Sequence, residues 1–236
     1  VMSSKKVLMF GWEYPPHHSG GLGVACKGMA HALIDNDVHV CFMLPKTMPI
    51  RDVKVPVAFA DKHIEKQAPL TGHLEVLARE LQNPYLNSVQ YELKMNHFIA
   101  SGGKIFPRSL FEQVEYYGAL VHTLSQKELD QYDVIHAHDW LCFPAGIAAK
   151  KRTGKPFIAH IHATEFDRCG GQNVNQRVYD KEREGFHAAD HIIAVSELTR
   201  RTVINHYGIH PEKVSVVHNG NTEAIGKGTT RFSSLK

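Results

Sequence analysis

The sequence predicts an α/β protein built on a doubly wound, Rossmann-like parallel sheet. Short apolar runs, typical of buried strands, alternate along the chain with longer stretches whose apolar residues recur at helical spacing. Polar or glycine-bearing segments directly follow several of these runs, as in open parallel sheets that bind ligands beyond the carboxyl ends of their strands. With 236 residues, 43% of them hydrophobic and 22% charged, the chain is long enough to bury one sizeable core.

The first half of the chain combines clear elements with weaker ones. In chain order we expect a strand at 7–10, a helix at 24–34, a strand at 38–44 that ends at Pro45, a weaker strand within 53–59, a helical face at Leu74, Leu77, Ala78 and Leu81, an antiparallel pair of 89–93 with 104–106, and a helix at 110–124. The antiparallel pair is expected because two alternating segments flank the turn Ser101-Gly102-Gly103.

The second half alternates more regularly between strands and helices. In chain order we expect a strand at 133–136, a helix at 140–151, a strand at 155–161, a helix at 174–188, a strand at 191–195, a helix at 197–207 and a strand at 214–217. Ser196 is placed to cap the start of the last helix, and Gly208 is placed to end it. This order predicts parallel strands joined by crossover helices.

A glycine loop lies between the first strand and the first helix. Gly20 and Gly21 allow another group to approach the backbone closely, and the following helix start offers unpaired N–H groups and a positive dipole end. An anion would fit there, although a tight turn without a ligand is the simpler alternative. A dinucleotide site is not predicted, because Gly20 lies too far beyond Phe10 and no acidic residue ends the second strand.

Composition and charge exclude several classes of protein. The formal net charge of +3 is too small to indicate nucleic-acid binding. No apolar run approaches the roughly 20 residues of a membrane span, and the N-terminal stretch lacks a secretory pattern, so we expect a cytoplasmic protein. The four cysteines are widely spaced and form no C-x-x-C pair, which indicates reduced thiols.

Two His-x-His pairs invite a metal hypothesis. Alternation along a strand places His136 with His138, and His160 with His162, on one face, where imidazoles could bind zinc as in metal-dependent hydrolases. The first strand, however, ends without a carboxylate or histidine that could complete such a site. We therefore expect no metal ligands here and keep the hydrolase as an alternative.

Six motifs together resemble the retaining glycosyltransferases of the glycogen and starch synthase type. They occur in the same order and spacing at 12–16, 20–23, 136–140, 162–165, 194–196 and 217–220. The resemblance covers essentially residues 5–221 and implies a GT-B enzyme, in which two Rossmann-like domains face each other across a cleft. Residues 1–218 would be the N-terminal, acceptor-side domain and 219–236 the crossover toward a C-terminal donor-binding domain, which we expect to be absent from this chain.

The resemblance also implies roles for individual residues. His162 and Asp139 would be catalytic, with His162 near the reacting carbon of the transferred sugar. The expected substrate-binding residues are Glu13, His18, Gly20, Gly21, Leu22, His138 and Glu165. The two glycines would contact the pyrophosphate of the donor.

The implied substrates are a nucleotide sugar, such as ADP-glucose or UDP-glucose, and a glucan or other sugar acceptor. No cofactor is implied. The donor stays open because His18 stands where synthases close to the bacterial glycogen enzyme carry a lysine, and because Val24 and Ala25 stand where other relatives often carry a basic residue or histidine. We expect residues 1–236 to fold alone but not to transfer sugar. A noncatalytic carbohydrate-binding domain is a further alternative.

Overall fold

The computed structural model describes residues 4–62 and 109–220, and within them seven parallel strands form one sheet. The strands are β1 (Lys6–Phe10), β2 (His39–Leu44), β3 (Val57–Phe59), β4 (Val134–His138), β5 (Phe157–Ile161), β6 (His191–Ala194) and β7 (Val214–Val216). Their order across the sheet is β3-β2-β1-β4-β5-β6-β7. The predicted doubly wound α/β fold is therefore confirmed.

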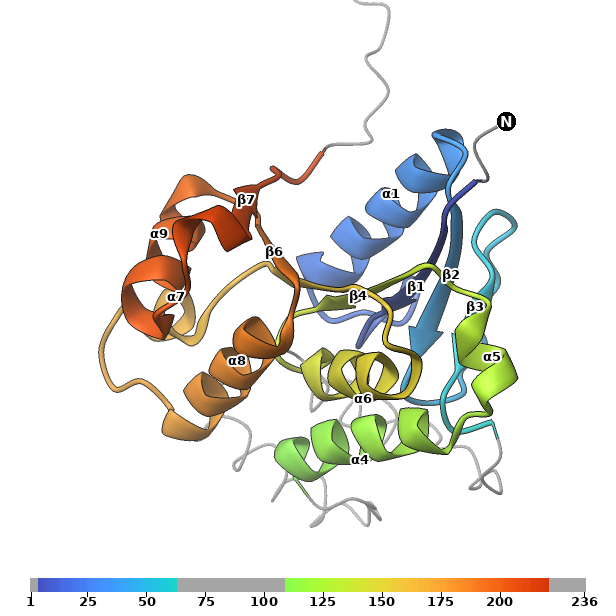
Figure 1. The fold of residues 1–236 in the computed structure, drawn as a ribbon, viewed down its shortest axis with the longest axis horizontal. Coiled ribbons are helices and arrows are strands. Elements are labelled where there is room, and N and C mark those ends of the chain that lie inside the picture. Colours follow the sequence, from blue (N-terminus) through green and yellow to red (C-terminus); the bar gives the residue numbers. More distant parts are fainter. Residues whose placement is uncertain (1–3, 63–108, 221–236) are drawn as a thin grey trace, which may run out of the picture.

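Helices cover both faces of this sheet (Figure 1). They are α1 (Gly21–Asp35), α4 (Leu110–Thr123), α5 (Gln126–Asp130), α6 (Phe143–Thr153), α7 (Glu165–Cys169), α8 (Gln176–Ala188) and α9 (Glu197–Tyr207), and a 3₁₀ turn spans Pro211–Lys213. Figure 1 shows α1 on one side of the sheet and α4, α6 and α8 on the other. In the described part of the chain, no helix is long and apolar enough to cross a bilayer.

Alternation along the strands decides which side chains face α1. In β1, Val7 and Met9 pack in the core cluster under α1, whereas Leu8 and Phe10 pack in the larger cluster under α4, α6 and α8. In β4, Ile135 and Ala137 belong to the larger cluster. Since successive side chains point to opposite faces, the histidines of β4 lie on the α1 side.

The sequence of crossovers creates a switch point beside β1. The chain passes from β1 to β2 and β3 in one direction, and then to β4 and the later strands in the other. β1 pairs in parallel with both β2 and β4. Ligands of open α/β sheets bind beyond the carboxyl ends of the strands at such a point, so the loops after β1, β4 and β5 are the expected site.

Most predicted elements are confirmed, with differences at their ends. The first helix begins at Gly21 rather than Val24, so the second glycine is already helical. The helix predicted from Trp140 begins only at Phe143, and the strand within 53–59 covers just Val57–Phe59. The capping role of Ser196 and the left-handed stop at Gly208 are confirmed.

Two short helices, α5 and α7, were not predicted. Both begin with a capping box, in which the N-cap side chain and the third helical residue bond to each other's backbone N–H. The helical face at 74–81, the antiparallel pair within 89–106 and the segment 221–236 lie outside the described residues.

Candidate active site

The glycine loop leads directly into the first turn of α1. Gly20 is the N-cap residue in an extended conformation and supplies no side-chain cap of its own. A Cβ atom built on Gly21 would meet nothing within 4 Å. The space beside Gly21 is therefore open, and the unpaired N–H groups and positive dipole end of a 15-residue helix make it suitable for an anion.

Glu13 holds this loop in shape. Its Oε1 accepts a hydrogen bond of 2.9 Å from the Gly23 N–H, and its Oε2 accepts bonds of 2.9 Å from both the N–H and the hydroxyl of Ser19. His18 places its Nδ1 3.0 Å from the carbonyl oxygen of Gly20. Both carboxylate oxygens of buried Glu13 are thus engaged within the loop, which gives this residue a structural part in the site.

Asp139 forms a tight turn at the end of β4. It is fully buried and has a left-handed φ of 59°, which an aspartate tolerates better than most residues. Its N–H donates to the carbonyl oxygen of His160 at 2.8 Å, and its Oδ1 accepts a 2.7 Å bond from the His162 N–H. The carboxylate therefore fixes the backbone of His162 beyond β5.

Four histidines from β4 and the end of β5 form a buried stack. His136 and His138 have ring centroids 4.4 Å apart, and those of His160 and His162 are 4.5 Å apart. Two hydrogen bonds join the strands, from His136 Nε2 to His160 Nδ1 at 3.1 Å and from His138 Nδ1 to His162 Nε2 at 3.0 Å. The predicted placement of each His-x-His pair on one face is confirmed.

Burial keeps these imidazoles neutral. It lowers the pKa of His136 to about 3 and the pKa values of His138 and His160 well below the ordinary 6.5. Burial also lowers the pKa of His162, although the carboxylate of Asp139 opposes this effect. His162 is only half-buried, so it is the member of the stack that a substrate can contact.

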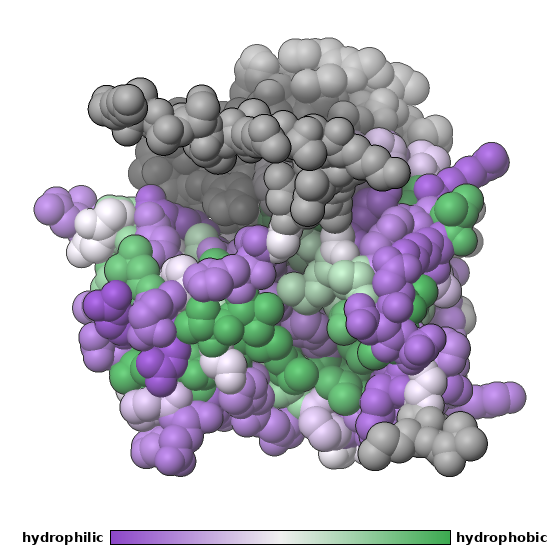
Figure 2. All heavy atoms as spheres, turned by 90° about the horizontal axis from the view of Figure 1, so that it is seen from above, coloured by the Kyte–Doolittle hydropathy of each residue, from purple (hydrophilic) through white to green (hydrophobic). Residues whose placement is uncertain are grey.

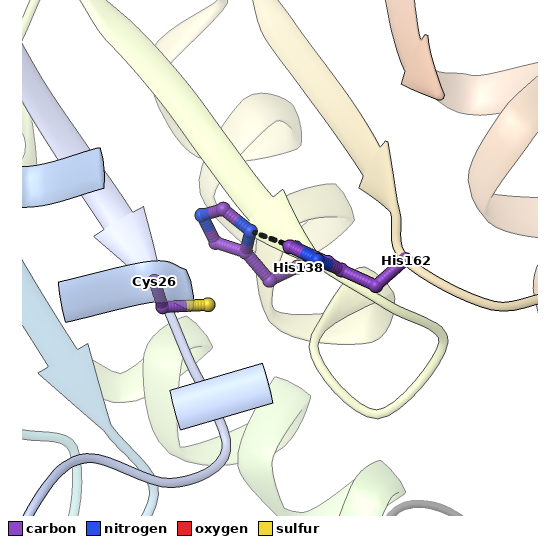
Figure 3. A group of neighbouring side chains, drawn as sticks. All are labelled: Cys26, His138 and His162. Atoms are coloured by element: carbon purple, nitrogen blue, oxygen red, sulfur yellow. Dashed lines mark hydrogen bonds between the residues drawn. The ribbon is translucent and has the colours of Figure 1, made fainter. Parts of the chain in front are cut away.

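Helix α1 brings its own side chain to the stack. Cys26, one turn after the glycine loop, lies beside His138 and His162 (Figure 3). One ligand atom from each of these three residues lies within 4.8 Å of the others. Helix α1, which begins at the glycine loop, therefore meets the end of β4 and the loop after β5.

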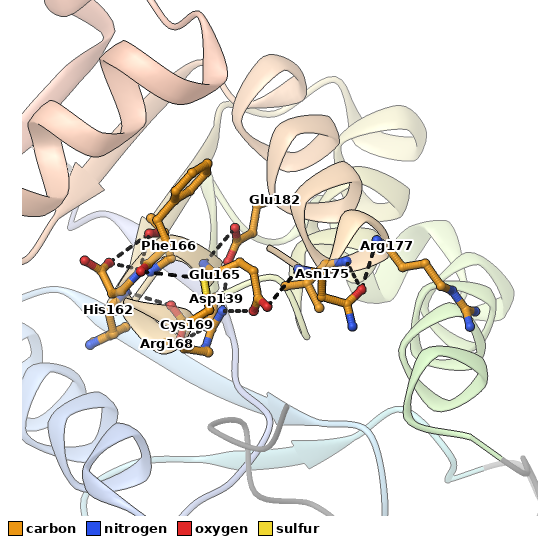
Figure 4. A network of polar contacts seen from close by, with 12 residues as sticks. Asp139, His162, Glu165, Phe166, Arg168, Cys169, Asn175, Arg177 and Glu182 are labelled. Carbon is orange, nitrogen blue, oxygen red and sulfur yellow. Dashed lines mark hydrogen bonds and ion pairs between the residues drawn. The ribbon is translucent and has the colours of Figure 1, made fainter. Parts of the chain in front are cut away.

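Arg168 lies behind Asp139 in a buried network that sequence reasoning missed (Figure 4). Its Nη1 bonds Glu182 Oε1 at 2.9 Å, and its Nη2 is 3.9 Å from Asp139 Oδ2. Burial raises the pKa of Glu182 to about 7 against the opposing charge of Arg168, and Glu182 also accepts a bond from the Tyr207 hydroxyl. No sequence spacing links Arg168 to Glu182, which lies 14 residues away on α8.

Three residues that the sequence assigns to substrate binding have buried side chains. The side chain of Leu22 is buried in the core cluster under α1, so only its backbone can reach a ligand. Glu165 is buried, accepts a 3.1 Å bond from the Asn175 N–H, and lies 3.9 Å from Arg168. His138 is fully buried behind His162. Their side chains therefore support the site from beneath.

The chain is similar in sequence and fold to several glycosyltransferases. The sequence pattern of Glycosyltransferase Family 4 matches residues 19–222. The uncharacterized glycosyltransferase MJ1607 of Methanocaldococcus jannaschii is 27% identical over 228 residues, which cover 91% of this chain and 46% of that protein. Glycogen synthase of Mycobacterium tuberculosis strain H37Rv is 26% identical over 230 residues, which cover 91% of this chain and 48% of that protein.

A solved structure shows the same fold. The catalytic domain of starch synthase IV from Arabidopsis thaliana, bound to ADP and acarbose, matches with a TM-score of 0.56 and 14% identity, over 92% of this chain and 52% of that one. The present chain spans about half the length of the curated relatives it matches.

Proposed function

The chain belongs to Glycosyltransferase Family 4, and we propose that it is the acceptor-side domain of a retaining enzyme that transfers glucose from a nucleotide sugar to a glucan or another sugar acceptor. In this proposal residues 1–218 form the domain, 219–236 lead toward a second, donor-binding domain, and the protein is cytoplasmic. ADP-glucose and UDP-glucose are the two donors to test, since the similar proteins include a glycogen synthase and a starch synthase that was solved with ADP.

One observation carries this proposal: the start of α1 adjoins His162. The space beside Gly21 at the start of α1 is open, and Cys26 of the same helix lies beside His162. A diphosphate held at the helix start would therefore place its sugar next to His162.

The chemistry follows from charge and burial. The departing diphosphate gains negative charge, which backbone N–H groups and a helix dipole stabilise when water is excluded. His162 is neutral and half-buried, so it can hydrogen-bond a sugar hydroxyl without adding charge. Asp139 holds the His162 backbone by a 2.7 Å bond, and the Arg168 guanidinium lies on the other side of Asp139.

A second domain is part of the proposal because the chain spans about half the length of the relatives it matches. Val24 and Leu198 are 51% and 66% exposed in the first turns of α1 and α9, at the edge where the strands end. Figure 2 shows a zone of hydrophobic residues within a hydrophilic surface on one face of the molecule. Apolar side chains at this edge would suit a facing domain that closes over the donor.

Two alternatives, a metal-dependent hydrolase and a noncatalytic carbohydrate-binding domain, account for the site less well. The described ranges hold two groups of three potential metal ligands, one of three histidines and one of two histidines with a cysteine, and neither includes a carboxylate, which gives the hydrolase no added support. A noncatalytic domain would leave the open helix start unexplained.

The decisive experiment is an assay of the complete enzyme, with both domains, against ADP-glucose and UDP-glucose with a glucan primer. We expect glucose transfer with retained anomeric configuration, and no transfer by residues 1–236 alone although circular dichroism shows them folded. Donor hydrolysis without any transfer to an acceptor would contradict the proposal, and so would sustained transfer by residues 1–236.

A further inference from the structure

We infer that Cys26, His138 and His162 form a binding site for a thiophilic divalent cation, zinc above all, that acts on the domain as an inhibitor rather than as a cofactor. A thiol and two imidazoles are the donor set that zinc accepts in tetrahedral sites, and three protein ligands leave the fourth position open. The site differs from the one that the His-x-His pairs suggested, because it takes one histidine from each pair and its third ligand from α1.

The geometry is close to what zinc requires. The three ligand atoms lie within 4.8 Å of one another. Zinc bonds of about 2.0–2.3 Å hold tetrahedral ligand atoms roughly 3.3–3.8 Å apart, so a contraction of at most about 1.5 Å completes the site. Figure 3 shows that the three side chains come from α1, the end of β4 and the loop after β5. Of the three, only the loop residue His162 is partly exposed, and it gives the ion a route of entry.

A buried nitrogen supports the inference independently. His138 Nε2 is buried and has no hydrogen-bond partner among the described residues. The other ring nitrogen, Nδ1, bonds His162 Nε2 at 3.0 Å. When His138 donates in that bond, its Nε2 carries a lone pair with nothing to bind, which is an unfavourable state in a dry interior. A bound cation would satisfy it, and His162 would exchange its bond to His138 for a bond to the metal.

Electrostatics also favour a cation at this place. Burial raises the pKa of the Cys26 thiol, and the carboxylates of Asp139 and Glu13 raise it further. These nearby negative charges oppose a bare thiolate but stabilise a dication. Binding exchanges one proton for the metal: the Cys26 S–H bond breaks, a sulfur–metal bond forms, and the proton leaves to solvent, so no oxidant or reductant is needed.

A second group, His136 with His138 and His160, is less suited to an exchanging ion. All three of its members are buried, so an ion would have to pass through the packed stack to reach them. The group with Cys26 is therefore the one that solution metal can occupy.

Occupancy would remove His162 from the sugar site. This consequence rests on the proposed function, because it assumes that His162 contacts the transferred sugar. Metal and donor sugar would then exclude each other, and zinc would inhibit transfer reversibly.

The test is a titration of reduced, metal-free residues 1–236 with Co²⁺, followed by displacement with Zn²⁺. We expect one Co²⁺ per chain, a thiolate-to-cobalt charge-transfer band, and visible bands with tetrahedral intensity. Cys26→Ser and His162→Asn should each weaken binding by at least about 100-fold, because losing even an outer-sphere partner typically costs 10- to 100-fold. Cys41→Ser, which changes a half-buried thiol on β2, is the matched control and should bind as the unmodified chain does.

Circular dichroism must show each variant folded, and Cys26→Ala replaces Cys26→Ser if the latter fails to fold. Absence of one-to-one binding at a several-fold excess of metal would overturn the inference, and so would a charge-transfer band that survives loss of Cys26. Because metal binding is read out without any sugar, its failure leaves the proposed transfer reaction untouched. In the complete enzyme, zinc should inhibit the Cys26→Ser variant less than the unmodified protein, each relative to its own metal-free rate.

Discussion

Replacing Gly21 by alanine separates the fold of the loop from its proposed function. Gly21 is the first residue of α1, its φ is not left-handed, and an added Cβ would meet nothing within 4 Å. Alanine is favoured over glycine in helices by up to about 1 kcal/mol. Gly21→Ala should therefore leave the melting temperature of residues 1–236 unchanged or slightly raised.

The same methyl group would occupy the space proposed for the diphosphate. A hydrogen bond to a charged group contributes roughly 1.5–3 kcal/mol, so loss of one such contact should weaken nucleotide binding by about 10- to 150-fold. The assay is calorimetric titration of the complete enzyme with ADP and with UDP. Whichever nucleotide binds the unmodified enzyme should show the loss.

Val53→Ala is the control for this experiment. It removes an exposed side chain shortly before β3, outside α1 and outside the edge proposed to face the second domain. We expect it to bind the nucleotide as tightly as the unmodified enzyme does. Unchanged affinity in Gly21→Ala, together with an unchanged fold, would refute the assignment of the phosphate site.

Three further predictions concern the residues around this site. In the complete enzyme, His162→Ala and Asp139→Ala should each lower kcat by about 10²- to 10⁴-fold, because the first removes the imidazole and the second removes the acceptor of the His162 N–H; near-normal turnover in both would remove them from the mechanism. Asp139→Asn tolerates the left-handed φ and can still accept that N–H, so it should lose less activity than Asp139→Ala. Glu13→Gln should lower the free energy of unfolding by about 1–3 kcal/mol in urea titrations, because one carboxylate acceptor for the Gly23 or Ser19 donors is lost, and an unchanged midpoint would argue against the loop bonds. Burial lowers the pKa of His136 to about 3, so the folded state excludes a proton that the unfolded chain takes up below about pH 6.5. The free energy of unfolding should therefore be at its full value above pH 6.5 and fall by up to about 1.4 kcal/mol per pH unit between pH 6.5 and 3. In His136→Gln the free energy of unfolding should fall less steeply over the same pH range.

The sequence was most informative where local chemistry sets the structure. Apolar runs and helical spacing located the strands from β1 to β7 that fall within the described residues, and Ser196 and Gly208 marked the ends of α9. Parallel topology then brought the loops after β1, β4 and β5 together, because all parallel strands end at one edge. Residues that follow strands could therefore be assigned to a common site without a structure.

The sequence was least informative where partners lie far apart along the chain. Nothing near Arg168 indicates that it pairs with Glu182 on α8 or lies behind Asp139. Cys26 was expected only to be a reduced thiol, and its approach to His138 depends on how α1 packs across β4. Leu22 was assigned to the substrate by motif, yet its apolar side chain is buried in the core beneath α1.

The bonds from Glu13 to Ser19 and Gly23 have a thermodynamic consequence for ligand capture. A flexible loop loses conformational entropy when a ligand orders it, at a cost of about 0.5–1.5 kcal/mol for each immobilised side chain. Here the carboxylate has already set the shape of the loop in the free protein, with three bonds of 2.9 Å. A nucleotide that arrives at this loop would meet a surface in its final form, so the slow step of productive association would be the approach of the facing domain.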